Sequence, residues 1–187
     1  MAPKDSIAIR PFISADMPQL QELHSALIPV PYPSSFFLNQ LIQSNHLCLV
    51  AHDTSLVQGP VAFVTASLRK QGDMDQHIQL LTLGVLPSHQ SKGLARRLVL
   101  QVVAALNPSG GQISVHTHVC TTNTPGQHFY ESLGMRLRMQ DHHPVIARNV
   151  YSYSTRSRPH VQALPNHEQD LFRSRDAYFM EGRIQGY

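Results

Sequence analysis

The sequence has few features of an exported or membrane-bound protein. It contains only two cysteines, Cys48 and Cys120, both in apolar or β-branched surroundings, and its first dozen residues hold no long apolar run. No segment approaches the roughly 18 uninterrupted apolar residues of a membrane span. We therefore expect a reduced protein of the cytoplasm, with the nucleus as the alternative compartment, and no membrane-spanning segment.

The sequence also lacks the pattern of a nucleic-acid-binding protein. Tryptophan is absent, and aromatic residues make up only 7% of the 187 residues. The formal net charge of +3 suits an anionic ligand, but aromatic residues do not alternate with a basic stripe, so no nucleic-acid partner is expected. With 42% hydrophobic residues, the chain can bury one sizeable core, which favours a single domain over residues 1–187.

Apolar periodicity predicts alternating strands and helices. Prolines in segment 28–33 end the first helix, and a polar stretch at 69–76 predicts a hairpin loop. Residues 142–175 are rich in His, Pro, Ser and Arg, which predicts an insertion or a long loop. The order of elements favours an α/β fold with a mixed sheet. We expect strands at about 6–12, 46–52, 60–68, 77–86, 112–121, 135–140 and 176–184, and helices at about 14–27, 34–42, 92–106 and 124–133.

The stretch LTLGVLPSHQSKGLARRL, residues 81–98, predicts a strand, a polar turn and a helix. Backbone amides at a helix start, here 90–95, are unused by the helix and can bind an anion. Gly93 would let a phosphate approach the backbone closely, and Ala95 has a side chain too small to block it. The alternative is a plain connection in which Gly93 only relieves crowding. The positive charges nearby belong to Lys92, Arg96 and Arg97.

The spacing of this turn matches neither of two common phosphate motifs. The Walker A pattern and the dinucleotide-binding glycine pattern are both absent. Gln90-x-x-Gly93-x-Ala95 instead resembles motif A of the GCN5-related N-acetyltransferase (GNAT) family, whose amides hold the pyrophosphate of acetyl-CoA. The resemblance implies acetyl-CoA as cosubstrate and no metal.

A second stretch, TTNTPGQHFYESLGM at residues 121–135, resembles motif B of the same family. There an Asn opens a helix beside the cofactor, as Asn123 would, while Met135 stands in place of the usual Phe. Taken alone, Asn123 is an ordinary helix cap and Tyr130 a core residue. The two motifs imply the GNAT fold for about 5–140 plus the closing strand, with a mostly antiparallel sheet of about seven strands and about four helices. The cofactor-binding residues that they imply are Leu83, Val85, Gln90, Ser91, Lys92, Gly93, Leu94, Ala95, Arg96, Asn123 and Tyr130.

Three stretches resemble the NatE and NatF type N-terminal acetyltransferases more narrowly. IPVPYPSSFF at 28–37 is similar to their peptide-lining segment, and LTLGV at 81–85 to one of their strands. VHTHVCTTN at 115–123 resembles a strand whose His positions a catalytic water, and counting back from Tyr130 places His118 there. The resemblance implies a peptide or small amine as substrate. The substrate-binding residues that it implies are Tyr32, Gln79, Leu81, Tyr151 and Tyr153.

Acetyl transfer from a thioester to an amine requires three groups: a base for the amine, a donor for the developing oxyanion, and an acid for the departing thiolate. The resemblance assigns the oxyanion donor to the backbone amide of Val85 and the acid to Tyr130. The base would be His118, directly or through water, because an ordinary His pKa near 6.5 suits this role.

One position departs from the family pattern. Gln79 stands where the NatE and NatF enzymes keep a catalytic Tyr, and a Gln cannot act as a base. His77, on the same strand face, could replace the Tyr in part, although a solvent-facing role suits it better. Two alternatives therefore stay open: a lysine or small-molecule amine as acceptor, and a catalytically weak acyl-CoA-binding module.

The twelve histidines raise the question of a metal. His116 and His118 share one strand face, and the pair His142 and His143 could approach them, but two ligands from one strand do not make a site. We expect no metal. Nothing in the sequence indicates an oligomeric state.

Overall fold

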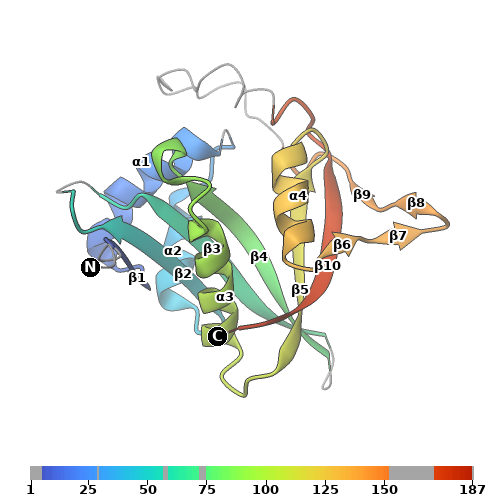
Figure 1. Ribbon diagram of the computed structural model, residues 1–187, viewed down its shortest axis with the longest axis horizontal. Helices are drawn as coiled ribbons and strands as arrows, with labels where there is room; N and C mark the ends of the chain where they lie inside the picture. Colours follow the sequence, from blue (N-terminus) through green and yellow to red (C-terminus); the bar gives the residue numbers. More distant parts are fainter. Residues whose placement is uncertain (1–5, 29, 57–58, 72–74, 152–170, 187) are drawn as a thin grey trace.

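The central feature of the computed structural model is one twisted sheet with helices on both faces (Figure 1). The structure describes residues 6–28, 30–56, 59–71, 75–151 and 171–186. The helical elements are η1 (Ser14–Asp16), α1 (Met17–Leu27), α2 (Ser34–Ile42), η2 (Pro87–His89), α3 (Leu94–Leu106) and α4 (Thr124–Ser132). The strands are β1 (Ile7–Pro11), β2 (His46–Asp53), β3 (Ala62–Gln71), β4 (Asp75–Val85), β5 (Gln112–Cys120), β6 (Arg136–Leu137), β7 (Met139–Gln140), β8 (His143–Pro144), β9 (Ile146–Ala147) and β10 (Ala177–Gln185).

The sheet is mixed, with a single parallel pair among its described strands. Its order is β1-β2-β3-β4-β5-β10-β6, and β9 also pairs with β10. All of these pairs are antiparallel except β4 with β5. The predicted fold class, a mostly antiparallel α+β sheet with four helices, is therefore confirmed.

The parallel pair separates before its strands end. β4 and β5 are in register only from His77 with Ser114 to Leu80 with Thr117, although each strand continues beyond its last pair. At that point β4 carries an extra residue, Leu81, because Ala66 of β3 faces Leu80 while the preceding β3 residue already faces Thr82. Such a bulge bends its strand. The gap between β4 and β5 is visible above their crossing point in Figure 1.

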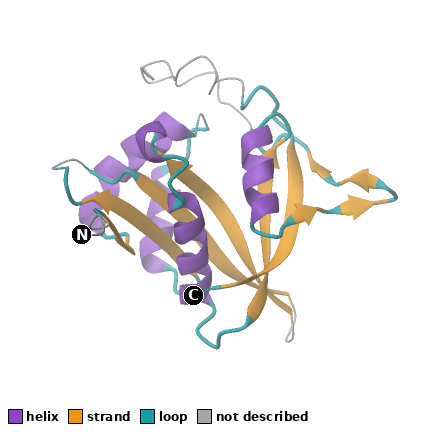
Figure 2. Cartoon of the chain, in the orientation of Figure 1, coloured by secondary structure: helices purple, strands orange, loops and turns teal. Residues whose placement is uncertain are grey.

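Each face of the sheet has its own apolar core, because consecutive side chains on a strand point to opposite faces. Phe63 and Val64 on β3 illustrate this: Phe63 packs with α1 and α2, and Val64 with α3. Helix α4 joins the α3 side through Tyr130, and Met135, just after the helix, belongs to the same core. Figure 2 shows α3 and α4 lying over the same face of the sheet. Side chains at 0% exposure in the α3 core include Val64, Ala66, Ile78, Leu98, Val99, Val102 and Val103.

Most predicted elements form, with three differences in extent. Helix 34–42 is confirmed, whereas the predicted helix 14–27 starts with the 3-10 turn η1 and becomes α-helical only at Met17. The predicted hairpin loop at 69–76 was wrong in length, because β3 continues to Gln71 and β4 begins at Asp75. The polar side chains of Arg69, Lys70 and Gln76 are compatible with strand because they are exposed to solvent.

The predicted strand 135–140 is divided into β6 and β7. Only β6 pairs with β10, while β7 pairs with β8 in a separate two-stranded hairpin that projects from the sheet (Figure 1). Asp141 and His142 make its turn with φ of +49° and +65°. The described part of the predicted insertion 142–175 thus contains the two short strands β8 and β9.

Candidate active site

A pocket of about 300 Å³ opens where β4 and β5 separate. Strand ends, the start of α3, helix α4, the α1–α2 segment and the chain before β10 all contribute walls. The structure thus brings together residues that the two motifs place far apart in the chain. The predicted site residues that line it are Tyr32, Leu81, Leu83, Val85, Gln90, Ala95, His118, Asn123, Tyr130 and Tyr151.

The backbone of Val85 faces this pocket. The next residue, Leu86, donates its N–H to Val61 O at 2.9 Å, toward β3. Because backbone groups alternate in direction along a strand, the N–H of Val85 points the other way, toward the gap with β5. Gln90 reaches the same edge, where its Nε2 donates to Val85 O at 2.9 Å. Gln90 thus ties the turn to the strand through a side-chain hydrogen bond.

Gly84 allows the α1 side of the sheet to approach this strand. A Cβ at Gly84 would lie 2.7 Å from the ring of Phe63 and 3.0 Å from Leu27. No side chain fits there without moving buried aromatic carbon. The glycine therefore brings Leu27, at the end of α1, to the wall of the pocket.

The turn before α3 has the backbone of an anion site. Ser91 and Gly93 have φ of +59° and +75°, and such left-handed residues turn successive N–H groups inward to form a concave nest. The first amide to close a turn of α3 is that of Arg97, which donates to Gly93 O at 3.0 Å, so the amides just before it stay unused by the helix.

Two predictions about this turn need correction. A Cβ at Gly93 would meet nothing within 4 Å, so the glycine does not relieve crowding; it supplies the left-handed conformation. The amide of Gln90 was predicted to be available, but it donates to Pro87 O at 3.3 Å, because the 3-10 turn η2 uses it.

The side chains of the turn lie around the nest rather than in it. Lys92 is exposed, and its Nζ donates to Ser88 O at 2.9 Å. Arg96 bonds Ser132 O at 3.3 Å and links α3 to the end of α4. The side chain of Leu94 is buried in the core, so only its backbone can reach an anion. Positive charge therefore sits beside amides that are free to donate.

His118 lies on β5 and contributes to the pocket wall. Partial burial lowers its pKa below the ordinary value, because desolvation disfavours the charged ring. Its ring contacts that of Phe179 edge-on at 5.3 Å, and Tyr151 donates its hydroxyl to the backbone oxygen of His118 at 3.2 Å. At neutral pH the ring is therefore uncharged and able to accept a proton.

Tyr130 lies on α4 with its side chain turned into the pocket wall, 9% exposed. Burial raises its pKa, and a hydrogen bond with the Thr117 hydroxyl offsets part of that rise. Thr117 is itself buried, and Leu80 O, 3.3 Å from its hydroxyl, is the alternative acceptor for its single hydrogen. Tyr130 is therefore protonated at neutral pH and can act as a donor. Sequence reasoning missed Thr117, whose alternation with His116 and His118 gave no separate signal.

Asn123 caps α4 and also lines the pocket. Its Oδ1 accepts from Gly126 N at 2.9 Å, which is the ordinary cap that the sequence left open. A Cβ at Gly126 would lie 2.8 Å from the Asn123 amide nitrogen, so glycine lets this cap form. The helix start is thereby held at the pocket edge.

Aromatic and aliphatic side chains form the opposite end of the pocket. Tyr32 lies between the rings of His24 and Phe36, with centroids 4.6 and 4.5 Å away. Tyr151 contacts Phe172 at 5.7 Å. Sequence reasoning missed the wall residues Leu27, Leu171 and Phe172, the last two because they lie in the presumed insertion. Tyr153 lies outside the described residues.

Gln79 is the predicted site residue that lies on β4 yet outside this lining. It is in register with His116 on β5, and its Nε2 donates to the neighbouring Leu80 O at 3.4 Å. His77 stacks on His116 with ring centroids 4.3 Å apart, and His116 Nε2 lies 3.8 Å from a Glu181 oxygen. These two histidines form a separate polar cluster rather than part of the pocket.

The geometry fits acetyl-CoA at one end. The amides of the nest and of the start of α3 would donate to a pyrophosphate, and the Val85 N–H would be the donor for a thioester carbonyl bound in the pocket. Among the described residues, no three His, Cys, Asp or Glu side chains gather closely enough to hold a metal ion. In the same part of the chain, every helix is too short or too polar to cross a membrane.

Comparison with known families identifies the family to which this pocket belongs. The model of the acetyltransferase (GNAT) family matches residues 17–135. The chain belongs to the GNAT acetyltransferase family. The matched region includes both motifs and all of the pocket except the segments around Tyr151 and Phe172. Acetyl-CoA is the usual cosubstrate of this enzyme family.

Two curated relatives are similar over most of this chain. The histone acetyltransferase MCC1 of Arabidopsis thaliana is 26% identical over 149 residues, covering 70% of this chain and 60% of the relative. The probable N-acetyltransferase san of Drosophila melanogaster is 21% identical over 134 residues, covering 72% and 70%. The chain thus spans less than two thirds of the length of the first of these relatives.

Solved structures share the fold at low identity. Arabidopsis thaliana NAA60 in complex with a bisubstrate analogue has a TM-score of 0.70 and 22% identity, covering 95% of this chain and 99% of that one. Arabidopsis thaliana Naa50 in complex with the bisubstrate analogue CoA-Ac-MVNAL has a TM-score of 0.69 and 18% identity, covering 95% and 98%. These similarities confirm the GNAT fold.

Proposed function

We propose that this GNAT enzyme transfers the acetyl group of acetyl-CoA to the N-terminal amine of a protein or peptide. The observation that carries the proposal is one pocket with two different ends. Gln90 and Ala95, which flank the amide nest, belong to its lining together with the aromatic residues Tyr32, Tyr151 and Phe172, and His118 and Tyr130 line the same pocket. Such a pocket suits a phosphate-bearing donor on one side and a side chain with a free amine on the other.

At the cofactor end, backbone groups provide most of the recognition. The amides after Gly93 would bind the pyrophosphate, with Lys92 and Arg96 adding charge. The N–H of Val85 would donate to the acetyl oxygen as it becomes an oxyanion, which requires no side chain. Bound acetyl-CoA supplies the activated acetyl group.

At the reacting centre, two side chains move protons. The neutral ring of His118 would accept a proton from the incoming ammonium, directly or through water. Tyr130 would give its proton to the departing thiolate sulfur. Thr117 holds the Tyr130 hydroxyl, so this donor is oriented before the substrate arrives.

The acceptor end supports a peptide. Leu27, Tyr32 and Phe172 offer an apolar site for a first side chain, and His24 and Phe36 hold Tyr32 in place. The similarly folded Naa50 was solved with an analogue that joins CoA to the peptide MVNAL, which supports the same class of acceptor here. Gln79 lies outside the pocket lining, so the proposed base is His118 alone.

A second acceptor class has one observation in its favour. MCC1, a relative at 26% identity, is named a histone acetyltransferase, which suggests a lysine amine. The two acceptors can be separated by incubating the enzyme and acetyl-CoA with a peptide library. Half of the library has free N-termini and acetylated lysines, and the other half has blocked N-termini and free lysines.

We expect acetylation of the free N-termini, measured by mass spectrometry, and its loss in His118→Ala with acetyl-CoA binding intact. Transfer confined to the lysine peptides would replace the proposal with the second acceptor class. Binding of acetyl-CoA with no transfer to any amine would favour an acyl-CoA-binding module.

A further inference from the structure

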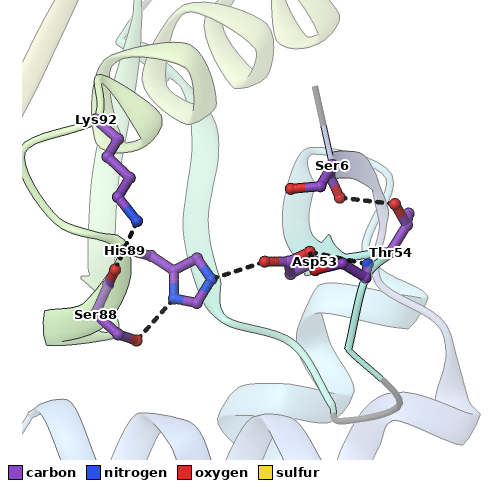
Figure 3. A network of polar contacts seen from close by, with 7 residues as sticks. Ser6, Asp53, Thr54, Ser88, His89 and Lys92 are labelled. Atoms are coloured by element: carbon purple, nitrogen blue, oxygen red, sulfur yellow. Dashed lines mark hydrogen bonds and ion pairs between the residues drawn. The ribbon is translucent and has the colours of Figure 1, made fainter. Parts of the chain in front are cut away.

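A buried polar pair lies directly behind the anion-binding turn. His89 ends the 3-10 turn η2, is separated from the segment 91–93 by Gln90 alone, and is 8% exposed. Its Nε2 lies 3.2 Å from Oδ2 of Asp53 at the end of β2 (Figure 3). The side chains of His89 and Asp53 are 10% and 13% exposed. The pair joins the turn to β2, which is separated from β4 by β3 in the sheet.

Asp53 is itself firmly oriented. The backbone N–H and the hydroxyl of Ser55 donate to its Oδ1 at 2.9 and 2.6 Å. These hydrogen bonds, with that of His89, hold the pKa of the Asp53 carboxyl far below its ordinary value. The next residue, Thr54, bonds Ser6 O through both its N–H and its hydroxyl, which ties this corner to the start of β1.

The state of the His89 ring follows from its two neighbours. An ionised carboxylate only accepts hydrogen bonds, so Nε2 of His89 must carry a hydrogen. The other nitrogen, Nδ1, lies 2.9 Å from the Ser88 hydroxyl, which can donate to it or accept from it. Both ring nitrogens are therefore engaged, and the ring has a single orientation.

This pair differs from the other polar contacts of the turn in its reach. The Gln90 side chain bonds Val85 O, five residues away, and Lys92 bonds Ser88 O, four residues away. Asp53 lies 36 residues from His89 in the chain. Contacts within the turn shape it, but a contact to a distant strand fixes its position relative to the sheet, and hence to the Val85 N–H.

We propose that Asp53 and His89 form a latch that holds the turn 88–93 in its anion-binding conformation, which makes both of them positioning residues for acetyl-CoA. The inference rests on the proposed use of acetyl-CoA by this pocket. A turn that is already ordered gives up little conformational freedom when a pyrophosphate binds. Without the latch, part of the binding free energy must order the turn.

Substitutions of His89 can separate the hydrogen bond from the packing. His89→Phe fills a similar volume but removes the donor to Asp53, and we expect the Kd for acetyl-CoA to rise about ten-fold. His89→Gln keeps an N–H near the position of Nε2, and we expect it to retain most of the affinity. The kcat at saturating acetyl-CoA should be unchanged in both variants.

The experiment is a calorimetric titration of the full chain with acetyl-CoA and with CoA, with no acceptor present. Asp53→Ala removes the same contact from the other side, so it should raise Kd to a similar extent. The double variant Asp53→Ala with His89→Phe should be no weaker than either single variant, because both act through one contact. This second pair of variants keeps the test decisive if His89→Phe does not fold.

Asp16→Asn is the matched control for lost stability. It weakens another ion pair, with Arg10 at 2.6 Å, whose hydrogen bonds do not involve the turn, so it should lower the melting temperature and leave the Kd unchanged. The latch is overturned if Asp53→Ala leaves the Kd for acetyl-CoA unchanged, or if Asp16→Asn raises this Kd as much as Asp53→Ala does. It is also overturned if wild type binds neither CoA nor acetyl-CoA. A wild type that binds acetyl-CoA yet acetylates no peptide contradicts the proposed function and leaves the latch to be judged by its own titration.

Discussion

The two ends of the pocket are built in different ways. The cofactor end is largely backbone, from the Val85 strand through the turn at Gly93 to the first turn of α3, all within about a dozen consecutive residues. The acceptor end is side chains from distant segments: Leu27 and Tyr32 from around the α1–α2 connection, and Tyr151 and Phe172 from the chain before β10. A local backbone motif suits a ligand that is always the same, such as a cofactor. A wall of side chains from separate segments lets single substitutions alter the preference for the acceptor.

The largest expected effect is at the junction of the two ends. His118→Ala should lower kcat by at least about a hundred-fold, because it removes the proposed base. The Kd for acetyl-CoA should change little, since the nest is backbone. His116→Ala is the matched control, because it lies on the same face of β5 but outside the pocket lining. Equal losses in both variants would contradict the assignment of the base.

The pH dependence of the same step has a defined sign. Burial lowers the pKa of His118, so the ring stays neutral, and usable as a base, to a pH below the ordinary value of 6.5. We expect the acidic limb of kcat/KM to lie below pH 6.5 and to be absent from the residual activity of His118→Ala. An acidic limb above pH 6.5 that persists in the variant would assign it to another group.

On the cofactor end, Gly93→Ala tests the backbone directly. A Cβ there meets no atom, but a φ of +75° disfavours alanine by roughly 1 to 2 kcal/mol. We expect the KM for acetyl-CoA to rise about ten-fold while the KM for the acceptor is unchanged. A steady-state titration of each substrate at saturating levels of the other separates the two. A rise confined to the acceptor KM would reverse the proposed orientation of the pocket.

On the acceptor end, Phe172→Ala should have the opposite pattern. It removes an aromatic wall and its contact with Tyr151, so we expect the acceptor KM to rise about five-fold for peptides with large apolar first residues. Peptides that begin with a small residue should be affected less. An unchanged ratio between large and small first residues would mean that Phe172 does not set the preference.

The smallest expected effect at neutral pH is on stability, at His24, whose ring packs against Tyr32. His24 is 1% exposed, and its Nε2 has no hydrogen-bond partner among the described residues. Burial lowers its pKa to about 4. His24→Phe should therefore raise the free energy of unfolding by about 1 kcal/mol at pH 7, because a buried unpaired polar atom is removed.

The pH response of stability distinguishes this cause from better packing. Because the folded pKa of His24 lies below the unfolded value of about 6.5, the unfolded chain binds the proton more readily. The stability that depends on a neutral His24 is therefore fully present above pH 6.5, and it is lost as the pH falls from 6.5 toward 4. Denaturant unfolding at several pH values should show that loss in wild type and a smaller loss in His24→Phe. Parallel curves would exclude His24 as the titrating group.

The prediction from sequence was accurate where neighbouring residues act together. Gly93, Asn123 and the start of α3 lie in short motifs, so the local pattern contains the information for their geometry. Thr117 was missed because it reaches the pocket only through the pairing of β5 with its neighbours. Phe172 was missed because it reaches the pocket through the chain that returns before β10. Gln79 was placed among the substrate residues by the family resemblance, but it precedes the bulge at Leu81 on β4 and lies outside the pocket lining.

The sequence by itself determined the family, the order of the elements and the turn that can hold a phosphate, because each depends on residues within a dozen positions of one another. The tertiary structure alone decided two further points: which side chains close the acceptor end, and that Asp53 stands behind His89. These contacts join segments that are close in space only because the sheet brings β2, β4, β5 and β10 together, and no short-range pattern records the long-range pairing of strands.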